Sequence, residues 1–282
     1  MGIPMTALEV LKAATGYLAQ HGVENPRLNA EHLLAHVLGK EKRIDLYLEF
    51  DRPLGEKERT PLRELAKRRS QGVPLQHLLG TVEFCGRIFR CDSRALIPRP
   101  ETEQLVELVL KETPHARSLV DVGTGSGVIA ASLALAWPEA IGYACDISKD
   151  ALALASENIA CHDLENQISL IHCNLLEALT GPFDTIVANL PYIPTSEISS
   201  LAREVHYDPL TALDGGLAGL DLIECLMPAA KKHLSPGGLI ALEIGHDQSE
   251  MVCAMLAEHN YRDIASHADY QGIQRFVTAR HG

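Results

Sequence analysis

The tetrapeptide from Asn189 to Tyr192 places a carboxamide, a rigid proline and a phenol directly after the apolar run FDTIVA. A planar amino group attached to a carbonyl or an aromatic ring is a poor nucleophile, because its nitrogen lone pair is delocalised. A site can assist by accepting both N–H protons and by aligning the nitrogen with its target, and such positioning supplies roughly 7–11 kcal/mol at best. The Asn189 side-chain oxygen can accept one proton, and the carbonyl oxygen of Leu190 or Pro191 can accept the other. Tyr192 adds a ring wall or a hydroxyl, so the tetrapeptide predicts a substrate-binding and catalytic site for a planar amino group.

A second candidate site is the glycine-rich sequence DVGTGSG, which runs from Asp121 to Gly127 after the apolar run SLVDV. Its glycines allow a tight turn and the close approach of a ligand to backbone amides at a helix N-terminus. The next apolar run ends in Asp146, 19 residues beyond Gly127, where a carboxylate can accept both hydroxyls of an adenosine ribose. We therefore predict a site for an adenosine-containing cofactor, formed by Gly123, Thr124, Gly125, Ser126, Gly127, Asp146, Asn174, Leu175 and Asn189.

The spacing of the glycines indicates which cofactor this is. Dinucleotide-binding turns follow the pattern G-x-G-x-x-G, whereas this chain has G-x-G-x-G with Asp121 two residues before the first glycine. That form resembles the S-adenosylmethionine-dependent methyltransferases with a Rossmann-like sheet. An unrelated dehydrogenase-like turn is the alternative. Asn174 and Leu175 follow a third apolar run, where the edge of an adenine ring would lie.

The elements that must position these residues alternate between strands and helices. Apolar runs at 118–122, 141–146, 168–172, 185–189 and 239–244 predict buried strands, and the segments 149–160 and 220–234 predict helices between them. Two further strands are expected at 263–269 and 275–280. Near-continuous apolar strands that alternate with helices indicate an α/β fold with a mostly parallel sheet. The carboxyl ends of parallel strands share one edge, so Asn189 is expected beside the glycine turn.

The N-terminal part of the chain predicts a small helical bundle. Thr6 and Glu9 form a capping box that opens a helix to about His21. A second helix is expected from a cap near Asn29 to Gly39, and a third over residues 55–72. A hairpin is expected near 81–92. We predict an N-terminal helical substrate-recognition domain over 1–80, a β-hairpin linker over 81–95 and a methyltransferase domain over 96–282.

The charge distribution argues against a protein that coats nucleic acid. The 282 residues have a formal net charge of −12. Residues 1–95 hold 15 Lys and Arg against 12 Asp and Glu, about +3, whereas residues 96–282 hold 10 against 25, about −15. A basic stretch over 57–70 is either the solvated face of a helix or a surface that faces a partner.

Cysteine and histidine usage predicts neither disulfides nor a metal site. The seven cysteines are scattered, odd in number and without a C-x-x-C motif, which fits reduced thiols. The 13 histidines are interpreted as surface or core residues. We find no secretory leader and no stretch of 18 uninterrupted apolar residues. The sequence therefore predicts a cytoplasmic protein without a membrane partner.

Several segments resemble one family. The segment LIPRPETEQLVE (96–107) is similar to the signature of the HemK/PrmC family, the peptide chain release factor glutamine N5-methyltransferases. The resemblance continues through residues 72–89, 121–130, 204–223 and 234–248, so it covers the chain essentially from end to end. It implies a class I methyltransferase domain with a seven-stranded sheet, and a helical N-terminal domain that helps to hold a protein substrate.

The resemblance also implies roles for the candidate residues. The segment Gly123 to Gly127, with Asp146 and Asn174, would hold S-adenosyl-L-methionine. The tetrapeptide would hold the glutamine side chain of the Gly-Gly-Gln loop of a class I release factor. Apart from the resemblance, a monomer is expected because nothing in the sequence demands more, and the negative charge predicts no direct contact with nucleic acid. Read from the residues themselves, the segment with Arg99, Glu101 and Thr102 is either a simple helix start after a linker or part of the rim near the cofactor, and these residues are not assigned a catalytic role.

Two positions depart from the family pattern. Leu190 replaces the usual proline of the tetrapeptide, and we expect a small effect because that position offers mainly its backbone carbonyl. The resulting N-L-P-Y sequence matches the form found in ribosomal RNA adenine dimethylases. Asn174 replaces the more usual aspartate, and its amide can accept a hydrogen bond but carries no charge.

Two alternative functions follow from the same residues. An adenine methyltransferase that acts on RNA or DNA would share the tetrapeptide and the cofactor, but it should carry a basic face on or beside the catalytic domain. A non-catalytic module with a vestigial cofactor pocket is the second alternative. The joint presence of the glycines, Asp146 and the tetrapeptide argues against that module.

Overall fold

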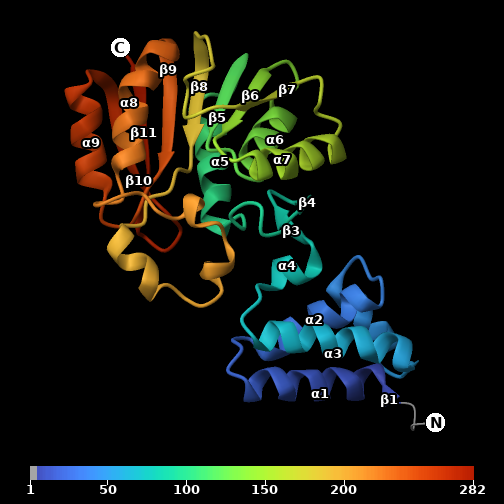
Figure 1. Ribbon diagram of the computed structural model, residues 1–282. Coiled ribbons are helices and arrows are strands. Elements are labelled where there is room, and N and C mark those ends of the chain that lie inside the picture. The colour runs from blue at the N-terminus through green and yellow to red at the C-terminus, as the bar shows by residue number, and fades with distance from the viewer. Residues whose placement is uncertain (1–4) are drawn as a thin grey trace. The chain divides into compact units, whose positions relative to one another are not determined.

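The computed structural model describes residues 5–282 and divides the chain into two compact units. The first contains the described residues up to Thr81 together with Ala202–Tyr207, and the second contains Val82–Leu201 and Asp208–Gly282 (Figure 1). Each unit has its own hydrophobic core. Within the described residues, no helix has the length and apolar character needed to cross a membrane.

The first unit is a helical bundle. It contains β1 (Met5–Thr6), α1 (Ala7–Gln20), α2 (Pro26–Val37), the 3₁₀ helix η1 (Arg43–Glu49), β2 (Pro53–Leu54), α3 (Glu56–Ser70), α4 (Leu75–Leu79) and η3 (Val205–Tyr207). The predicted capping box of α1 is confirmed, because the Glu9 amide donates to the Thr6 hydroxyl and the Thr6 amide donates to the Glu9 carboxylate, at 3.3 and 2.8 Å. Its core consists mainly of leucines and alanines, most of them from α1, α2 and α3.

The predicted start of the second helix is wrong. The N-cap residue is Asn25, in the left-handed conformation, and Pro26 occupies the first helical position, where a missing N–H costs nothing. Asn29 lies one turn inside α2. There its side chain donates to the Glu24 carbonyl at 2.9 Å and accepts a 2.7 Å hydrogen bond from Arg69.

The second unit contains a seven-stranded sheet with strand order β10-β11-β9-β8-β5-β6-β7. The five neighbouring strands β9, β8, β5, β6 and β7 pair in parallel. At the β9 edge, β11 pairs antiparallel with β9, and β10 pairs antiparallel with β11. Its strands are β5 (Ser118–Val122), β6 (Ile141–Asp146), β7 (Ile168–His172), β8 (Phe183–Ala188), β9 (Leu234–Glu243), β10 (Tyr261–Ala268) and β11 (Gln274–His281). The predicted seven-stranded, mostly parallel α/β fold is confirmed.

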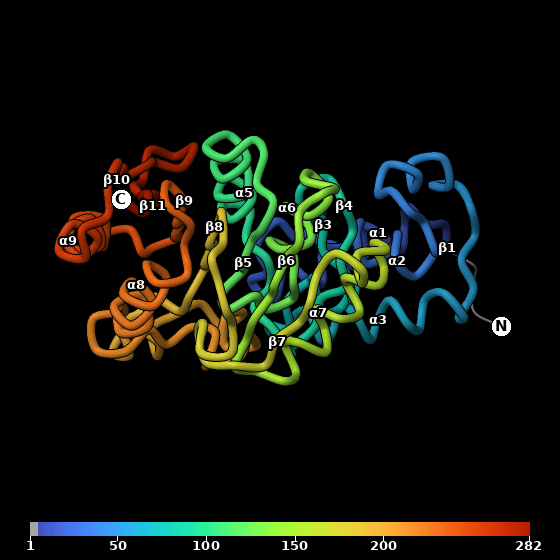
Figure 2. Tube along the Cα trace, turned by 90° about the horizontal axis from the view of Figure 1, so that it is seen from above, coloured from blue at the N-terminus to red at the C-terminus, as the bar shows by residue number. Residues whose placement is uncertain are grey.

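Helices cover both faces of this sheet, which Figure 2 shows from above. Leu119 of β5 packs with α5, α6 and α7, whereas the next residue, Val120, packs with α8 and α9. This alternation follows from the period of two along a strand. The helices are α5 (Pro100–Glu112), α6 (Val128–Ala136), α7 (Lys149–Cys161), α8 (Asp221–His233) and α9 (Ser249–Glu258), with η2 (Thr195–Ser200) and η4 (Leu210–Ala212) in the long loop after β8.

The hairpin expected near 81–92 is present as a two-stranded sheet of β3 (Thr81–Phe84) and β4 (Arg87–Arg90).

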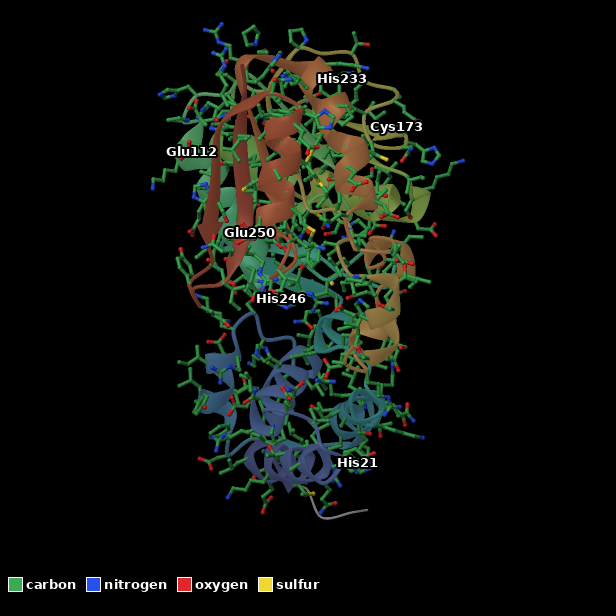
Figure 3. The ribbon with its side chains drawn as sticks, turned by 90° about the vertical axis from the view of Figure 1, so that its left-hand side faces the viewer. His21, Glu112, Cys173, His233, His246 and Glu250 are labelled. Carbon is green, nitrogen blue, oxygen red and sulfur yellow. The ribbon has the colours of Figure 1, made fainter. Side chains whose placement is uncertain are left out.

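The parallel strands of the main sheet all end at the same edge. His233, at the end of α8, and His246, after β9, lie at opposite ends of the sheet (Figure 3). Strands β5, β6, β8 and β9 all finish at the end that carries His246, and this carboxyl edge holds the candidate site.

Candidate active site

The glycine turn after β5 is held by the neighbouring strand. The amides of Gly123 and Thr124 both donate to the carbonyl oxygen of Cys145 in β6, at 2.9 and 3.0 Å. Gly123 has a φ of +70°, and a Cβ atom there would lie 2.8 Å from Leu190 Cδ2. A left-handed backbone in so narrow a space requires glycine. At Gly123 the turn therefore packs backbone without a side chain against the tetrapeptide.

Asp146 fixes the turn from the end of β6. One of its carboxylate oxygens accepts a hydrogen bond from the Gly125 amide at 2.9 Å, and the other accepts one from the Ser148 amide at 2.8 Å. A carboxylate oxygen has two lone-pair directions. Each oxygen can therefore accept a further hydrogen bond from a ligand hydroxyl, as the predicted ribose contact requires.

Asp121 supports the glycine turn through hydrogen bonds and does not line the cavity. Its carboxylate is fully buried and accepts hydrogen bonds from the Thr124 hydroxyl at 2.6 Å and the Ala130 amide at 3.1 Å. Burial raises the pKa of Asp121 to about 7, although these two hydrogen bonds oppose the shift. Asp121 thus ties the glycine turn to the first turns of α6.

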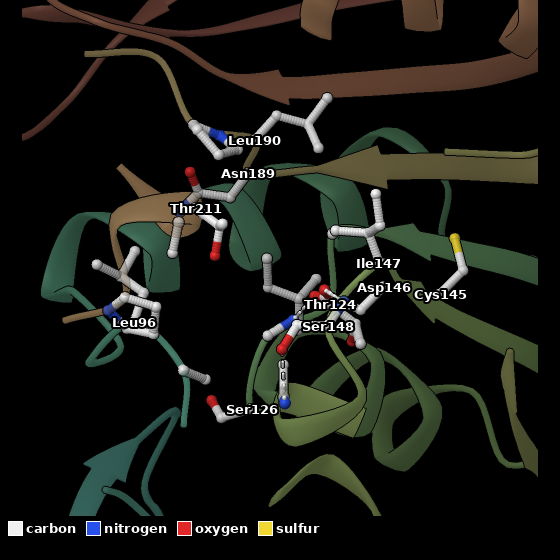
Figure 4. Close-up of a pocket in the computed structure, with 18 of the residues that line it drawn as sticks. Leu96, Thr124, Ser126, Cys145, Asp146, Ile147, Ser148, Asn189, Leu190 and Thr211 are labelled. Carbon is white, nitrogen blue, oxygen red and sulfur yellow. Dashed lines mark hydrogen bonds between the residues drawn. The ribbon is translucent and has the colours of Figure 1, made fainter. Parts of the chain in front are cut away.

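The cavity at this edge brings most of the predicted residues together (Figure 4). Two predicted residues do not line it. Gly127 is the N-cap of α6, with a φ of +81°, and a Cβ there would lie 3.1 Å from Ala155 Cβ. Tyr192 is the second. The predicted residues that line the cavity are Gly123, Thr124, Gly125, Ser126, Asp146, Asn174, Leu175, Asn189, Leu190 and Pro191.

The register of the sheet explains why Asn189 reaches this cavity. Val122 pairs with Ala188, so the chain leaves β5 and β8 at the same level. The Asn189 side-chain nitrogen donates a 3.1 Å hydrogen bond to the Thr102 hydroxyl in the first turn of α5. Its side-chain oxygen accepts no hydrogen bond from a described residue. That oxygen is therefore available to a ligand in the cavity.

Tyr192 turns away from the cavity toward a buried acid. Its hydroxyl donates to Glu243, the last residue of β9, over 3.4 Å. Burial, with the nearby carboxylate of Glu243 as the second cause, raises the pKa of Tyr192 to about 12. A phenol with that pKa stays protonated at neutral pH and does not act as a base. The backbone carbonyl of Tyr192 accepts a 2.9 Å hydrogen bond from the buried side chain of Gln248, which fixes this end of the tetrapeptide.

The two positions that depart from the family pattern differ in their surroundings. Leu190 is 4% exposed and packs in the core that α8 and α9 share with the sheet. Its side chain thus has a packing role in addition to the backbone carbonyl that was expected to be its main contribution. Asn174 is exposed at the cavity, and its nitrogen donates to the Glu177 carboxylate at 3.2 Å. Its oxygen is left without a partner among the described residues.

Of the three residues expected at the rim, Arg99 and Thr102 line the cavity and Glu101 does not. Arg99 lines the cavity and forms an ion pair with the buried carboxylate of Asp208 at 2.9 Å. Burial raises the pKa of Asp208 to about 6, whereas Arg99 opposes that shift. Glu101 lies in the first turn of α5, where the helix dipole favours negative charge. Thr102 does more than line the rim, because it contacts Asn189 directly.

Sequence reasoning missed Glu243 altogether. It lies in the run LIALEI, where a single acid among apolar residues resembles the polar end of a strand. The structure buries it to 2% exposure and gives it Thr102 and Tyr192 as partners. A charged residue inside an otherwise continuous apolar strand was the signal that could have found it, because such charges are rarely buried without a partner. Among the described residues, no group of His, Cys, Asp and Glu could hold a metal ion.

Comparison with known proteins places the chain in a family. The family model of the PrmC N-terminal domain matches residues 9–80, and that of the methyltransferase small domain matches residues 100–205. A release factor glutamine methyltransferase of Geobacter sulfurreducens is 43% identical, over 98% of this chain and 97% of the relative. One of Chlorobaculum tepidum is 37% identical, over 96% and 95%.

Solved structures agree on the fold alone. The T. thermophilus 16S rRNA methyltransferase RsmC, in complex with AdoMet and guanosine, has a TM-score of 0.52 at 18% identity. The match covers 72% of this chain and 50% of that chain. The sequence relationship, which extends over nearly the whole length, is the stronger finding. This chain belongs to the release factor glutamine methyltransferase family.

Proposed function

We propose that this protein transfers a methyl group from S-adenosyl-L-methionine to the side-chain amide nitrogen, N5, of the glutamine in the Gly-Gly-Gln motif of peptide chain release factors. The observation that carries the proposal is the orientation of Asn189 at the cavity. Its nitrogen is engaged by Thr102, and its oxygen has no partner among the described residues. The full-length similarity to release factor glutamine methyltransferases supports the choice of substrate.

The residues of the cavity fit the methyl donor. The turn at Gly123 and Gly125 has positive φ values and no side chains, so a ligand can approach its backbone closely. Asp146 offers lone pairs to two hydroxyls, and the exposed oxygen of Asn174 offers an acceptor to the amino group of an adenine. S-adenosyl-L-methionine, when bound, supplies an electrophilic methyl group on a sulfonium ion.

The residues around the tetrapeptide would position the glutamine. The Asn189 oxygen accepts one N–H of the substrate amide, and the carbonyl oxygen of Leu190 or Pro191 accepts the other. Both hydrogen bonds draw electron density toward the nitrogen and fix its direction of attack, which is a positioning effect. No strong base is needed, because the methylated amide loses its extra proton readily.

The remaining assignments extend this proposal. The first unit, which corresponds to the predicted domain 1–80, helps to hold the release factor, and the methyltransferase domain spans 96–282 after the hairpin linker. The protein acts as a monomer in the cytoplasm, and nucleic acid is not its partner. The formal charge of about −15 over residues 96–282 supports the last point, because a nucleic acid substrate favours a basic face.

The decisive experiment is mass spectrometry of a purified, unmethylated release factor after incubation with this protein and S-adenosyl-L-methionine. We expect one added methyl on the glutamine of the Gly-Gly-Gln motif. Adenine-containing RNA is the parallel substrate, because the sequence N-L-P-Y at Leu190 favours adenine as the second candidate. A methyl on RNA with none on the factor would overturn the proposal in favour of that candidate.

Asn189→Ala tests the role of the carboxamide. We expect this variant to lose methyl transfer and to retain its affinity for S-adenosyl-L-methionine, measured by isothermal titration. Turnover at the wild-type rate would contradict the assigned role.

A further inference from the structure

A buried carboxylate lies behind the tetrapeptide, and the proposed chemistry gives it no direct task. Glu243 ends β9, and its side chain has two partners. One oxygen accepts a 2.8 Å hydrogen bond from the Thr102 hydroxyl, and the other accepts from the Tyr192 hydroxyl over 3.4 Å. Burying an acid without a close cation is costly.

The hydroxyl of Thr102 transmits the position of that carboxylate to Asn189. A hydroxyl carries one hydrogen and can donate only once. Because Thr102 donates to Glu243, its oxygen can only accept from Asn189. An accepting oxygen at Thr102 requires the Asn189 nitrogen opposite it, at 3.1 Å, and not the Asn189 oxygen. The orientation of the carboxamide therefore depends on which way the Thr102 hydroxyl points.

We propose that Glu243 is a positioning residue for the methyl transfer, which acts through Thr102 to hold the Asn189 carboxamide with its oxygen toward the substrate amide. This inference rests on the proposed function, since it concerns the same site. Three elements meet in it: α5 contributes Thr102, β9 contributes Glu243, and the chain after β8 contributes Asn189. The contacts join residues that lie 87 and 141 positions apart in the sequence.

The charge state of Glu243 is part of this arrangement. Burial raises its pKa to about 7, while Thr102, Arg275 on β11 and Tyr192 lower it and Glu101 on α5 raises it. Arg275 is itself paired with Asp269 at 3.5 Å. A protonated Glu243 could donate to Thr102. The Thr102 hydrogen would then be free to donate to Asn189, and a carboxamide that accepts it through its oxygen turns its nitrogen toward the substrate.

Four variants test the proposal on the release factor reaction. We expect Thr102→Val to lower kcat at least tenfold, and Glu243→Gln, which keeps one accepting oxygen, to lower it less but by more than twofold, both with an unchanged Kd for S-adenosyl-L-methionine. Thr102→Ser keeps the hydroxyl and should retain most of kcat. Asp184→Asn is the matched control, because Asp184 lies at the start of β8 and accepts from the amides of Arg117 and Ser118 at the far end of the sheet. It should lower stability without changing kcat.

The pH profile separates positioning from a loss of packing. In the wild type, kcat should fall as the pH drops through about 7, because Glu243 takes up a proton. In Glu243→Gln, the lowered kcat should no longer change with pH through the titration of this group. Asp121 titrates in the same range, so only the difference between the two profiles reports on Glu243.

A measurement without substrate keeps the inference separate from the proposed function. In ¹⁵N-labelled protein, the side-chain NH₂ signal of Asn189 can be assigned by its absence in Asn189→Ala. We expect it to shift in Glu243→Gln and Thr102→Val but not in Asp184→Asn. A wild type that does not methylate the factor would overturn the proposed function alone. An unshifted NH₂ signal, or kcat within twofold of wild type in both variants, would overturn the role of Glu243. If Glu243→Gln does not fold, Thr102→Val decides.

Discussion

The carboxylate of Asp146 accepts a 2.9 Å hydrogen bond from the backbone amide of Gly125, so the end of β6 holds the turn that follows β5. Its other oxygen accepts from the Ser148 amide at 2.8 Å, which ties the same carboxylate to the start of α7. One side chain thus sets the shape of two adjacent turns of the cavity. A ligand that bonds to this carboxylate meets a group that is already oriented.

Removal of this carboxylate should weaken the binding of S-adenosyl-L-methionine. We expect Asp146→Ala to raise the Kd about tenfold, on the order of 1–2 kcal/mol for a lost charge-assisted hydrogen bond. Asp146→Asn keeps one accepting oxygen and should have a smaller effect. Isothermal titration measures both. An unchanged Kd in Asp146→Ala would mean that the ribose binds elsewhere.

The glycine turn offers a test with a closely matched control. Gly123 and Gly86 share a φ of +70°, but a Cβ at Gly123 would lie 2.8 Å from Leu190 Cδ2, whereas a Cβ at Gly86 would meet no atom within 4 Å. Both alanine variants carry the same backbone strain, on the order of 1–2 kcal/mol. We expect Gly123→Ala to lose stability beyond that shared cost and to raise the Kd for S-adenosyl-L-methionine.

Thermal unfolding and isothermal titration of the two variants check this prediction. Gly86 lies in the turn between β3 and β4, away from the cavity, so Gly86→Ala should leave the Kd unchanged. Equal losses of stability and equal Kd values in the two variants would show that the close approach to Leu190 has no consequence.

Three parallel strands of the second unit could be predicted closely, because each is an apolar run between polar turns. The segments 118–122, 141–146 and 168–172 coincide with β5, β6 and β7. The glycine turn, Asp146 and Asn189 could be predicted together, because parallel strands end at one edge. Their assignment to the cofactor and the substrate stays a prediction.

The features that the sequence did not predict depend on contacts between distant residues. Glu243 belongs to the site only because the sheet brings β9 beside β8 and α5 supplies Thr102. The segment 202–207 belongs to the first unit, where Glu204 pairs with Arg69 at 2.6 Å. No local pattern encodes such a pair. The start of α2 was a local error, because Pro26 at the first helical position favoured a start there.

The raised pKa of Glu243 predicts that stability and activity change in opposite directions with pH. Its ordinary pKa is 4.5, and burial raises it to about 7 in the folded protein. Between these values the folded protein binds a proton that the unfolded chain has lost. The stability that this group contributes is therefore fully present below pH 4.5 and is lost as the pH rises to about 7. Over the same range we expect kcat to rise, because the carboxylate that orients Thr102 forms.

Denaturant unfolding of the wild type and Glu243→Gln at a series of pH values measures this effect. The loss of stability on raising the pH should be smaller in the variant, by at most roughly 3 kcal/mol, since one pKa unit corresponds to about 1.4 kcal/mol. Other carboxyl groups, Asp121 among them, titrate equally in both proteins, so their contributions to the free energy of unfolding cancel in the difference. Parallel stability curves for the two proteins from pH 4.5 to 8 would show that Glu243 has an ordinary pKa. The pH dependence of kcat would then have another origin.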